Sequence, residues 1–231
     1  MDHDSPIPAC ERALLRELAR RQAAIAALPV TAERRRRWHA HNRGEPGEPM
    51  VVVEIGTFAG DLVEGLRCEH PLARAVEWEL RATITNHDLV DDDKVVEAVF
   101  PVGIHGGMRA FGLAVPTQRA HDAQGRALRY HQEPPLRALS AGLLDDLPPS
   151  PMQVDLAGAL ARQARIEELL GDILPTRLDC RALDWFGSPS IEVVRLMGME
   201  EMFCHLIEEP ELMARLYRRL TDDIIAFFRL L

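Results

Sequence analysis

Residues 50–55 read Met-Val-Val-Val-Glu-Ile, and this segment decides the fold class expected for the chain. It is continuous, apolar and rich in β-branched residues, as is typical of a strand buried on both faces of a parallel sheet. A helix is predicted from Pro71, with apolar side chains at helical spacing as far as Ile84. A second buried strand is expected at residues 95–100, Val-Val-Glu-Ala-Val-Phe. Strands that alternate with helices predict an α/β fold with parallel strands.

Helices are also expected before this strand–helix–strand core. Residues 11–28 repeat apolar side chains at helical spacing and end at Pro29, and Thr31 can cap a second helix through about residue 43. Residues 1–49 are therefore expected to form an N-terminal helical segment.

The second half of the chain is less regular at first and then strongly helical. An irregular insertion is expected at about 103–150, with a possible strand at 111–115. The remaining elements expected are a helix at 155–170, a short strand at 173–178, and helices opening at Pro189, after Gly198 and at Pro210.

Residues 50–231 are thus expected to form a partial (β/α) barrel. Only three or four strands are identified where a (β/α)₈ barrel needs eight. The apolar end at 227–231 also looks cut short, so the chain is expected to be the first part of a barrel.

Composition excludes several classes of function. The 27 basic and 36 acidic residues give a net charge of -9, which argues against a nucleic-acid partner. The apolar runs are too short for a membrane span, and the N-terminus has no signal-peptide pattern. The four cysteines contain no Cys-x-x-Cys pair, which excludes a disulfide scaffold or zinc ribbon and favours a cytoplasmic location.

Candidate catalytic residues lie where strands are expected to end, because α/β enzymes build their sites there. His105 follows the second strand and precedes Gly106 and Gly107, which would let a ligand approach the backbone. Asp179 and Asp184 follow the expected strand at 173–178. We therefore predict His105, Asp179 and Asp184 as catalytic residues.

Two substrate-binding residues are predicted in the N-terminal half. Glu54 lies at the end of the first strand, and Arg37 ends an Arg-rich run and has the side chain to hold a substrate carboxylate. No metal ligand is predicted in this chain.

The segment from Glu54 to Gly60, Glu-Ile-Gly-Thr-Phe-Ala-Gly, supports an alternative. It resembles the first motif of S-adenosylmethionine-dependent O-methyltransferases, whose glycines let the cofactor approach the backbone. Such a fold needs an acidic residue about 20 residues further on. Glu77 and Glu79 have that spacing but lie in a predicted helix.

The order of several segments resembles the uroporphyrinogen decarboxylase superfamily, and its methyltransferase-like branch more than the true decarboxylase. The closest likeness is at residues 202–211, Met-Phe-Cys-His-Leu-Ile-Glu-Glu-Pro-Glu, followed by 216–223, which end in Thr-Asp-Asp. Residues 186–190, Phe-Gly-Ser-Pro-Ser, look like the family's turn after a barrel strand, so Gly187 and Ser188 are expected to bind substrate.

The resemblance implies a (β/α)₈ barrel and an enzyme that moves a methyl group between a small donor, a corrinoid and a thiol. It also implies zinc and a corrinoid, but the family's His-x-Cys and later Cys ligands belong to the second half of the barrel, outside this chain. The expected partners are a small molecule or a corrinoid protein, with self-association at an unfinished sheet edge.

Three alternatives stay open. They are decarboxylation of an acidic tetrapyrrole, an S-adenosylmethionine-dependent methyltransferase, and a non-catalytic binding module. Residues 99–102, Val-Phe-Pro-Val, carry no acid where the decarboxylase has an essential Asp, and the decarboxylase's Arg-rich N-terminal motif is missing.

Overall fold

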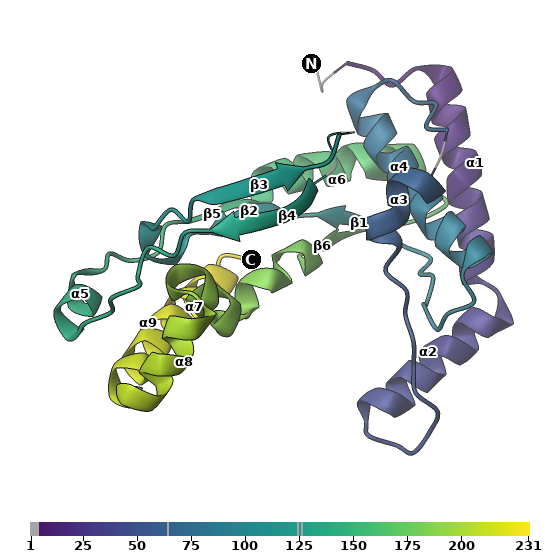
Figure 1. Ribbon diagram of the computed structural model, residues 1–231. Helices are drawn as coiled ribbons and strands as arrows, with labels where there is room; N and C mark the ends of the chain where they lie inside the picture. The colour runs from purple at the N-terminus through teal and green to yellow at the C-terminus, as the bar shows by residue number, and fades with distance from the viewer. Residues whose placement is uncertain (1–4, 64, 124, 126) are drawn as a thin grey trace. The chain divides into compact units, whose positions relative to one another are not determined.

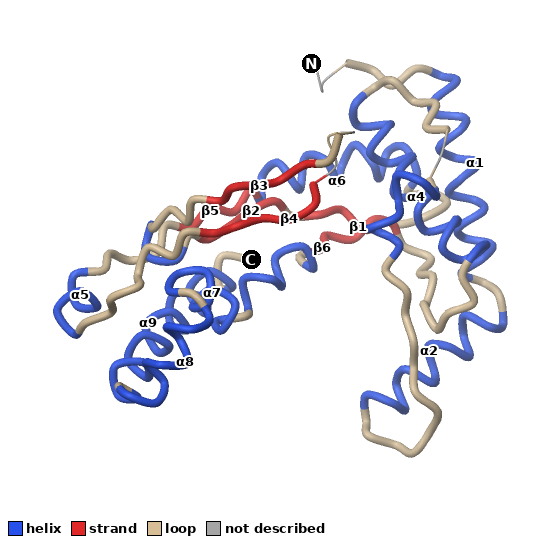
Figure 2. Tube along the Cα trace, viewed as in Figure 1, coloured by secondary structure: helices blue, strands red, loops and turns tan. Residues whose placement is uncertain are grey.

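The computed structural model describes residues 5–63, 65–123, 125 and 127–231, which form two compact units. Unit 1 consists of Met1–Val102 and Leu160–Leu178, and unit 2 of Gly103–Ala159 and Asp179–Leu231. The architecture is mixed α/β, as predicted, with more helix than strand (Figures 1 and 2). The described strands form three two-stranded sheets and no closed barrel. The domain boundary at residue 49 stays a prediction.

Helices dominate unit 1, and the expected ones are confirmed. They are α1 (Ala9–Ala26), α2 (Pro29–Asn42), α4 (Pro71–Leu89) and most of α6 (Leu156–Leu170). Pro29 and Pro71 occupy the first turns of α2 and α4, where a missing N–H costs no hydrogen bond. Helices α1 and α4 pack together, and their apolar faces share a core with the end of α6. Leu15, Leu80 and Leu170 are fully buried in that core.

The strand predicted at 50–55 is wrong. Residues 50–54 form an extended loop in which Val51, Val52 and Val53 are exposed, and Ile55–Phe58 continue as the 3₁₀ helix η1, followed by the short helix α3 (Ala59–Leu62). The loop's N–H groups bind carboxylates instead of a neighbouring strand. Val51 N–H donates to Asp93 at 2.9 Å, and Val53 N–H donates to Asp92 at 3.0 Å.

The strand predicted at 95–100 begins only at its last residue. Strand β1 (Phe100–Gly103) pairs with β6 (Thr176–Asp179), which confirms a strand near 173–178. Ahead of β1, the Gln22 amide donates to the carbonyls of Glu97 and Val99 at 3.0 and 3.4 Å. A side chain from α1 thus takes the carbonyl groups that a neighbouring strand would need.

Unit 2 contains two antiparallel ladders, so the expectation of parallel strands is wrong for both. Strand β2 (His105–Met108) pairs with β5 (Met152–Asp155), and β3 (Thr117–His121) pairs with β4 (Ala127–Gln132). The strand expected at 111–115 is also wrong, because Ala110–Gly112 form the 3₁₀ turn η2.

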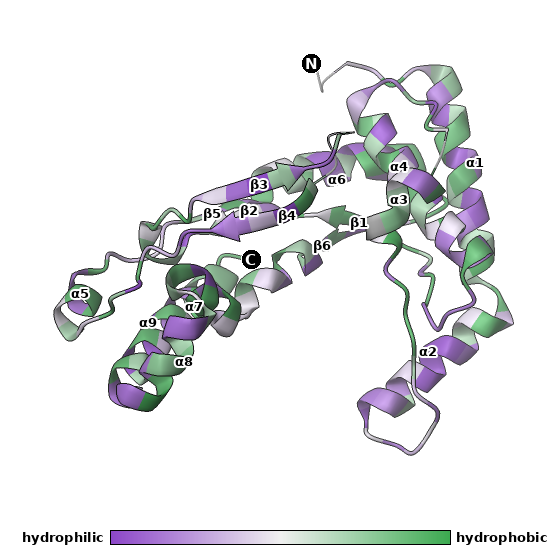
Figure 3. Cartoon of the chain, in the orientation of Figure 1, coloured by the Kyte–Doolittle hydropathy of each residue, from purple (hydrophilic) through white to green (hydrophobic). Residues whose placement is uncertain are grey.

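Three helices of unit 2 are confirmed, namely α7 (Pro189–Met197), α8 (Met199–Glu208) and α9 (Pro210–Phe228). The helix α5 (Ala141–Asp146), within the expected irregular insertion, and the 3₁₀ helix η3 (Arg181–Gly187) before α7 were not predicted. Helices α7, α8 and α9 pack against one another. Helix α9 is amphipathic (Figure 3) and buries Leu216 and Leu220 completely. None of the helices in the described part of the chain combines the length and apolarity needed to cross a bilayer.

Candidate functional site

A cavity of about 690 Å³ lies along β2 and β5 in unit 2. This volume is in the range of small-molecule sites, roughly 300–1,000 Å³. Its walls come from the two antiparallel strands and the residues that flank them, namely His105, Gly106, Gly107, Met108, Arg109, Pro151, Met152, Gln153 and Asp155. The predicted residue His105 therefore lines a pocket.

The two glycines after His105 are explained by packing. A Cβ atom on Gly106 would lie 2.7 Å from the carbonyl oxygen of Gln153, so only glycine lets β2 approach β5 this closely. A Cβ atom on Gly107 would lie 3.4 Å from the Phe186 ring. Gly106 therefore admits the neighbouring strand β5, and both glycines also line the cavity, where their expected role in admitting a ligand stays a prediction.

Arg109 is the polar group that sequence reasoning missed. Its side chain is exposed, lines the β2–β5 cavity, and has no hydrogen-bond or ion-pair partner within the part of the chain that the structure describes. It also lines an adjoining cavity of about 460 Å³, together with Phe186, Glu192 and Arg195. Arg195 donates to Glu192 at 2.8 Å, so in that pair the positive charge is compensated. Arg109 therefore presents an uncompensated guanidinium to both cavities.

Asp155 is the last residue of β5 and directly precedes α6. Its carboxylate accepts the N–H of Gly158 at 2.8 Å, which is the geometry of a helix cap. Asp155 thus caps the helix that was expected at 155–170.

Asp179 lies beside the strand that leads to His105. Its carbonyl accepts the Ile104 N–H at 2.9 Å, which fixes Asp179 next to the backbone that precedes His105. Its carboxylate binds Arg181 through the backbone N–H at 2.9 Å and Nε at 2.6 Å. Asp184 is exposed on η3, which packs against β2. The structure thus groups the elements that carry the three predicted catalytic residues, with the Asp179 carboxylate already engaged.

Gly187 and Ser188 lie where η3 passes into α7. A Cβ atom on Gly187 would meet the Phe228 ring at 3.6 Å, and the Ser188 carbonyl accepts the N–H of Ile191 at 3.1 Å. Ser188 therefore has a visible part in starting α7, whereas Gly187 lies at ordinary packing distance from Phe228. Their predicted contact with substrate stays a prediction.

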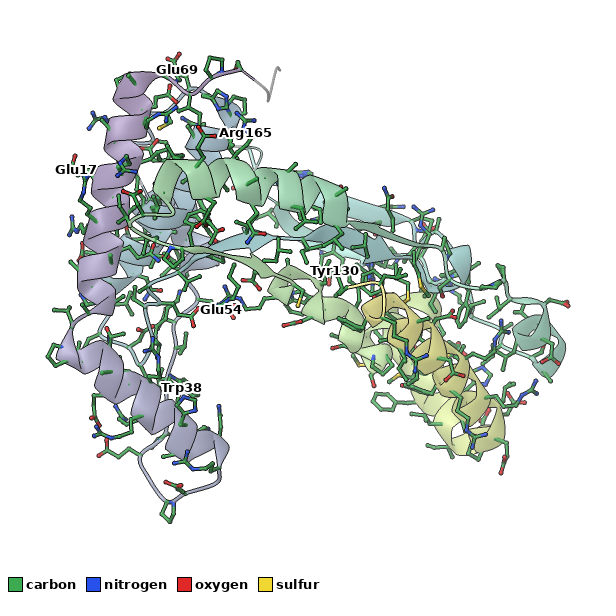
Figure 4. The ribbon with its side chains drawn as sticks, turned by 180° about the vertical axis from the view of Figure 1, so that it is seen from behind. Glu17, Trp38, Glu54, Glu69, Tyr130 and Arg165 are labelled. Carbon is green, nitrogen blue, oxygen red and sulfur yellow. The ribbon has the colours of Figure 1, made fainter. Side chains whose placement is uncertain are left out.

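Arg37 and Glu54 belong to unit 1. Arg37 donates to the Asp93 carboxylate at 2.7 Å, so the chain itself supplies the carboxylate that a substrate was expected to bring. The neighbouring Trp38 donates from Nε1 to the Asp93 carbonyl at 2.8 Å. Glu54 is exposed on the loop before η1 (Figure 4).

The glycine motif at 54–60 lacks the expected strand. Gly56 and Gly60 lie in η1 and α3, and open space surrounds the position of a Cβ atom on each. Glu77, the spaced acidic residue, is completely buried on α4 and accepts the N–H groups of Arg67 and Cys68 at 2.9 and 2.8 Å.

The pKa of the Glu77 carboxyl is lowered, whereas the pKa of the Cys68 thiol is raised. Burial by itself raises the pKa of Glu77, but hydrogen bonds from Cys68, Arg81 and Arg67 outweigh it, and the net pKa is lowered. Burial, followed by the nearby Glu77, raises the pKa of Cys68 to about 12. Cys68 is therefore a neutral core thiol and not a nucleophile or metal ligand.

The described residues of this chain do not fit a zinc ion. Across residues 5–63, 65–123, 125 and 127–231, no three His, Cys, Asp or Glu side chains are grouped so that they would hold a metal. Zinc ligands need deprotonated thiolates or imidazoles that converge on one point. We therefore derive no chemical step through zinc.

Comparisons of the chain with protein-family models, curated proteins and solved structures found no match.

Proposed function

We propose that this chain is a uroporphyrinogen decarboxylase-like protein related to corrinoid-dependent methyl transfer, and that the β2–β5 cavity binds its acidic small-molecule substrate. The observation that carries the proposal is the guanidinium of Arg109, which has no partner among the described residues and lines the same cavity of about 690 Å³ as His105. A cytoplasmic location and a corrinoid-protein partner are proposed with it.

The chemistry of Arg109 defines the class of ligand. A guanidinium presents N–H donors in a planar fork that matches the oxygens of a carboxylate or sulfonate. An uncompensated cation at a cavity wall gains most from a ligand that brings the missing negative charge. A small anionic thiol, the methyl acceptor implied by the family resemblance, has this property.

His105, Asp179 and Asp184 are proposed to act on the bound ligand. His105 is the only residue of the three that lines the cavity, and an imidazole can accept or donate a proton near neutral pH. We take β1 and β6 as barrel strands, with His105 and Asp179 at their carboxyl ends, where (β/α) barrels build their sites.

Decarboxylation of an acidic tetrapyrrole is the second candidate. It is favoured by the adjoining cavity of about 460 Å³, which shares Met108 and Arg109 with the first. The two cavities together offer room for a ligand larger than a small thiol.

The test is calorimetric titration of the full chain with two probes, 2-mercaptoethanesulfonate and the octacarboxylate uroporphyrin. We expect one probe to bind, and Arg109→Gln to weaken its binding about tenfold or more, because a charge-assisted hydrogen bond is worth about that factor. Arg218→Gln is the matched control, since Arg218 is exposed on α9 of the same unit and does not line either cavity.

Each outcome decides between the candidates. Binding of the thiol favours methyl transfer, and binding of uroporphyrin favours tetrapyrrole chemistry. Failure of both probes to bind would refute the proposal. Equal binding by the wild type and the Arg109 variant would place the site elsewhere.

A further inference from the structure

Arg109 begins a turn that contains a strained residue. The Arg109 carbonyl accepts the Gly112 N–H at 2.9 Å, and the Arg109 N–H donates to the Pro151 carbonyl at 3.0 Å. Between them, Phe111 has φ 52° and ψ 24°, a left-handed conformation that residues other than glycine rarely adopt. Strain of this kind persists only where the surroundings hold it, and it is concentrated at functional sites.

A hydrogen-bonded chain connects this turn to helix α9. The Phe111 N–H donates to the Ser150 hydroxyl oxygen at 2.9 Å. The Ser150 hydroxyl in turn donates to the Asp223 carboxylate, which also accepts the Ser150 N–H at 3.1 Å. Because the Ser150 proton points at Asp223, the serine oxygen presents its lone pairs to Phe111. Asp223 therefore fixes which group donates and which accepts in the two hydrogen bonds that join Phe111, Ser150 and Asp223.

The same face of α9 holds the Phe111 side chain. Arg219 lies one helical turn before Asp223, and its guanidinium carbon is 5.4 Å from the centre of the Phe111 ring. Arg219 is itself held by hydrogen bonds to the carbonyls of Leu144 and Leu147. The Phe111 ring is almost completely buried. Backbone and side chain of the strained residue are thus both fixed from α9.

We propose that Asp223 is a positioning residue for Arg109: through Ser150 it holds the Phe111 turn in its left-handed form and keeps the Arg109 guanidinium at the junction of the two cavities. The inference rests on the proposed function, because it gives Arg109 the task of binding the acidic ligand. It also assigns a physical role to the Thr-Asp-Asp segment that closes residues 216–223.

The experiment compares Asp223→Ala with Asp222→Ala in the full chain. Asp222 is the exposed neighbour on α9, so the two variants make the same chemical change with and without loss of the Ser150 contact. Two quantities are measured. Hydrogen–deuterium exchange over residues 109–112 reports the turn, and calorimetric titration with 2-mercaptoethanesulfonate and with uroporphyrin reports binding.

We expect Asp223→Ala to speed exchange in the turn and to weaken binding of the probe that the wild type binds by about tenfold. Asp222→Ala should change neither quantity. Asp223→Asn, which keeps an acceptor oxygen, should recover part of the affinity. In an Arg109→Gln background, Asp223→Ala should have no further effect on affinity, because the two residues act in series.

Ser150→Ala tests the same connection without altering α9, in case the Asp223 variants do not fold. Faster exchange in the turn with unchanged affinity would overturn the positioning role and leave the proposed function intact. Additive effects of Asp223→Ala and Arg109→Gln would overturn it too. Failure of the wild type to bind either probe would refute the proposed function, and the positioning role with it.

Discussion

Replacement of Glu77 by Gln is expected to destabilise unit 1 by about 2–4 kcal/mol at pH 7. The Glu77 carboxylate is completely buried and accepts the N–H groups of Arg67 and Cys68 and the Nε–H of Arg81, at 2.9, 2.8 and 2.8 Å. A glutamine turns an NH₂ group toward one of these donors, which costs about 1–3 kcal/mol for the unsatisfied N–H. The remaining bonds lose their charge assistance, which costs about 1 kcal/mol more.

The loss should depend on pH in a defined direction. The pKa of Glu77 is lower in the folded chain than its ordinary value, so its contribution to stability is fully present above about pH 4.3. That contribution disappears as the pH falls through the lowered, folded pKa. The free-energy gap between the wild type and Glu77→Gln should therefore be constant near neutral pH and narrow below about pH 4.

Urea unfolding followed by tryptophan fluorescence measures this gap, since Trp38 and Trp78 both lie in unit 1. Glu17→Gln is the control, because Glu17 is exposed on α1 and its replacement should change the free energy of unfolding by less than about 0.5 kcal/mol. A loss of unfolding free energy no larger than that of Glu17→Gln would refute the assignment of Glu77 as the buried acceptor for the N–H groups of Arg67 and Cys68. A free-energy gap that stays constant on acidification would refute it as well.

Three more outcomes are expected. Gly106→Val should destabilise unit 2 by about 1–3 kcal/mol and abolish probe binding, because its Cβ atom would lie 2.7 Å from the Gln153 carbonyl oxygen; wild-type melting and binding would contradict this. A thiol-specific reagent at pH 7 should modify the exposed Cys10, Cys180 and Cys204 quickly and Cys68 only after unfolding, and four fast thiols would contradict the burial and raised pKa of Cys68. Leu216→Ala should cost about 2–5 kcal/mol in urea unfolding, because Leu216 is completely buried on α9, and a cost below about 1 kcal/mol would count against that packing.

The helices could be predicted from the sequence because their signals are local. Proline in the first turn and an apolar stripe at helical spacing define α4 and α9 whatever else the chain does. Both helices are confirmed in the structure, where the apolar stripe is also the face that each helix buries. Leu80 on α4 and Leu220 on α9 are completely buried.

The strands could not be predicted in the same way, because β propensity does not say which groups will satisfy the backbone. Residues 51–53 are apolar and β-branched, yet the N–H groups of Val51 and Val53 bind the side chains of Asp93 and Asp92. The carbonyl groups of Glu97 and Val99 accept hydrogen bonds from the Gln22 amide. In both places a distant polar side chain replaces a neighbouring strand, and no local pattern reveals such a partner.

The candidate site was predicted in part. His105 was found because it follows a strand, and the structure places it in the cavity wall. Arg109 was missed because no motif surrounds it and its importance comes from the absence of a partner, which only the structure can show. Arg37 illustrates the opposite case, since it has the right chemistry for a substrate carboxylate but is paired with Asp93.

Several side chains of the acidic excess have a structural role, away from the β2–β5 cavity. Several carboxylates accept backbone N–H groups in place of regular secondary structure: Glu11 at residues 69 and 70, Glu77 at 67 and 68, Asp92 at 53 and 94, Asp93 at 51 and Asp223 at 150. None of these carboxylates lines the β2–β5 cavity, so the net charge of -9 does not describe the charge that a ligand meets there. There the uncompensated group is the guanidinium of Arg109. An acidic protein can therefore still bind an acidic ligand where a cation without an acidic partner among the described residues lines the cavity.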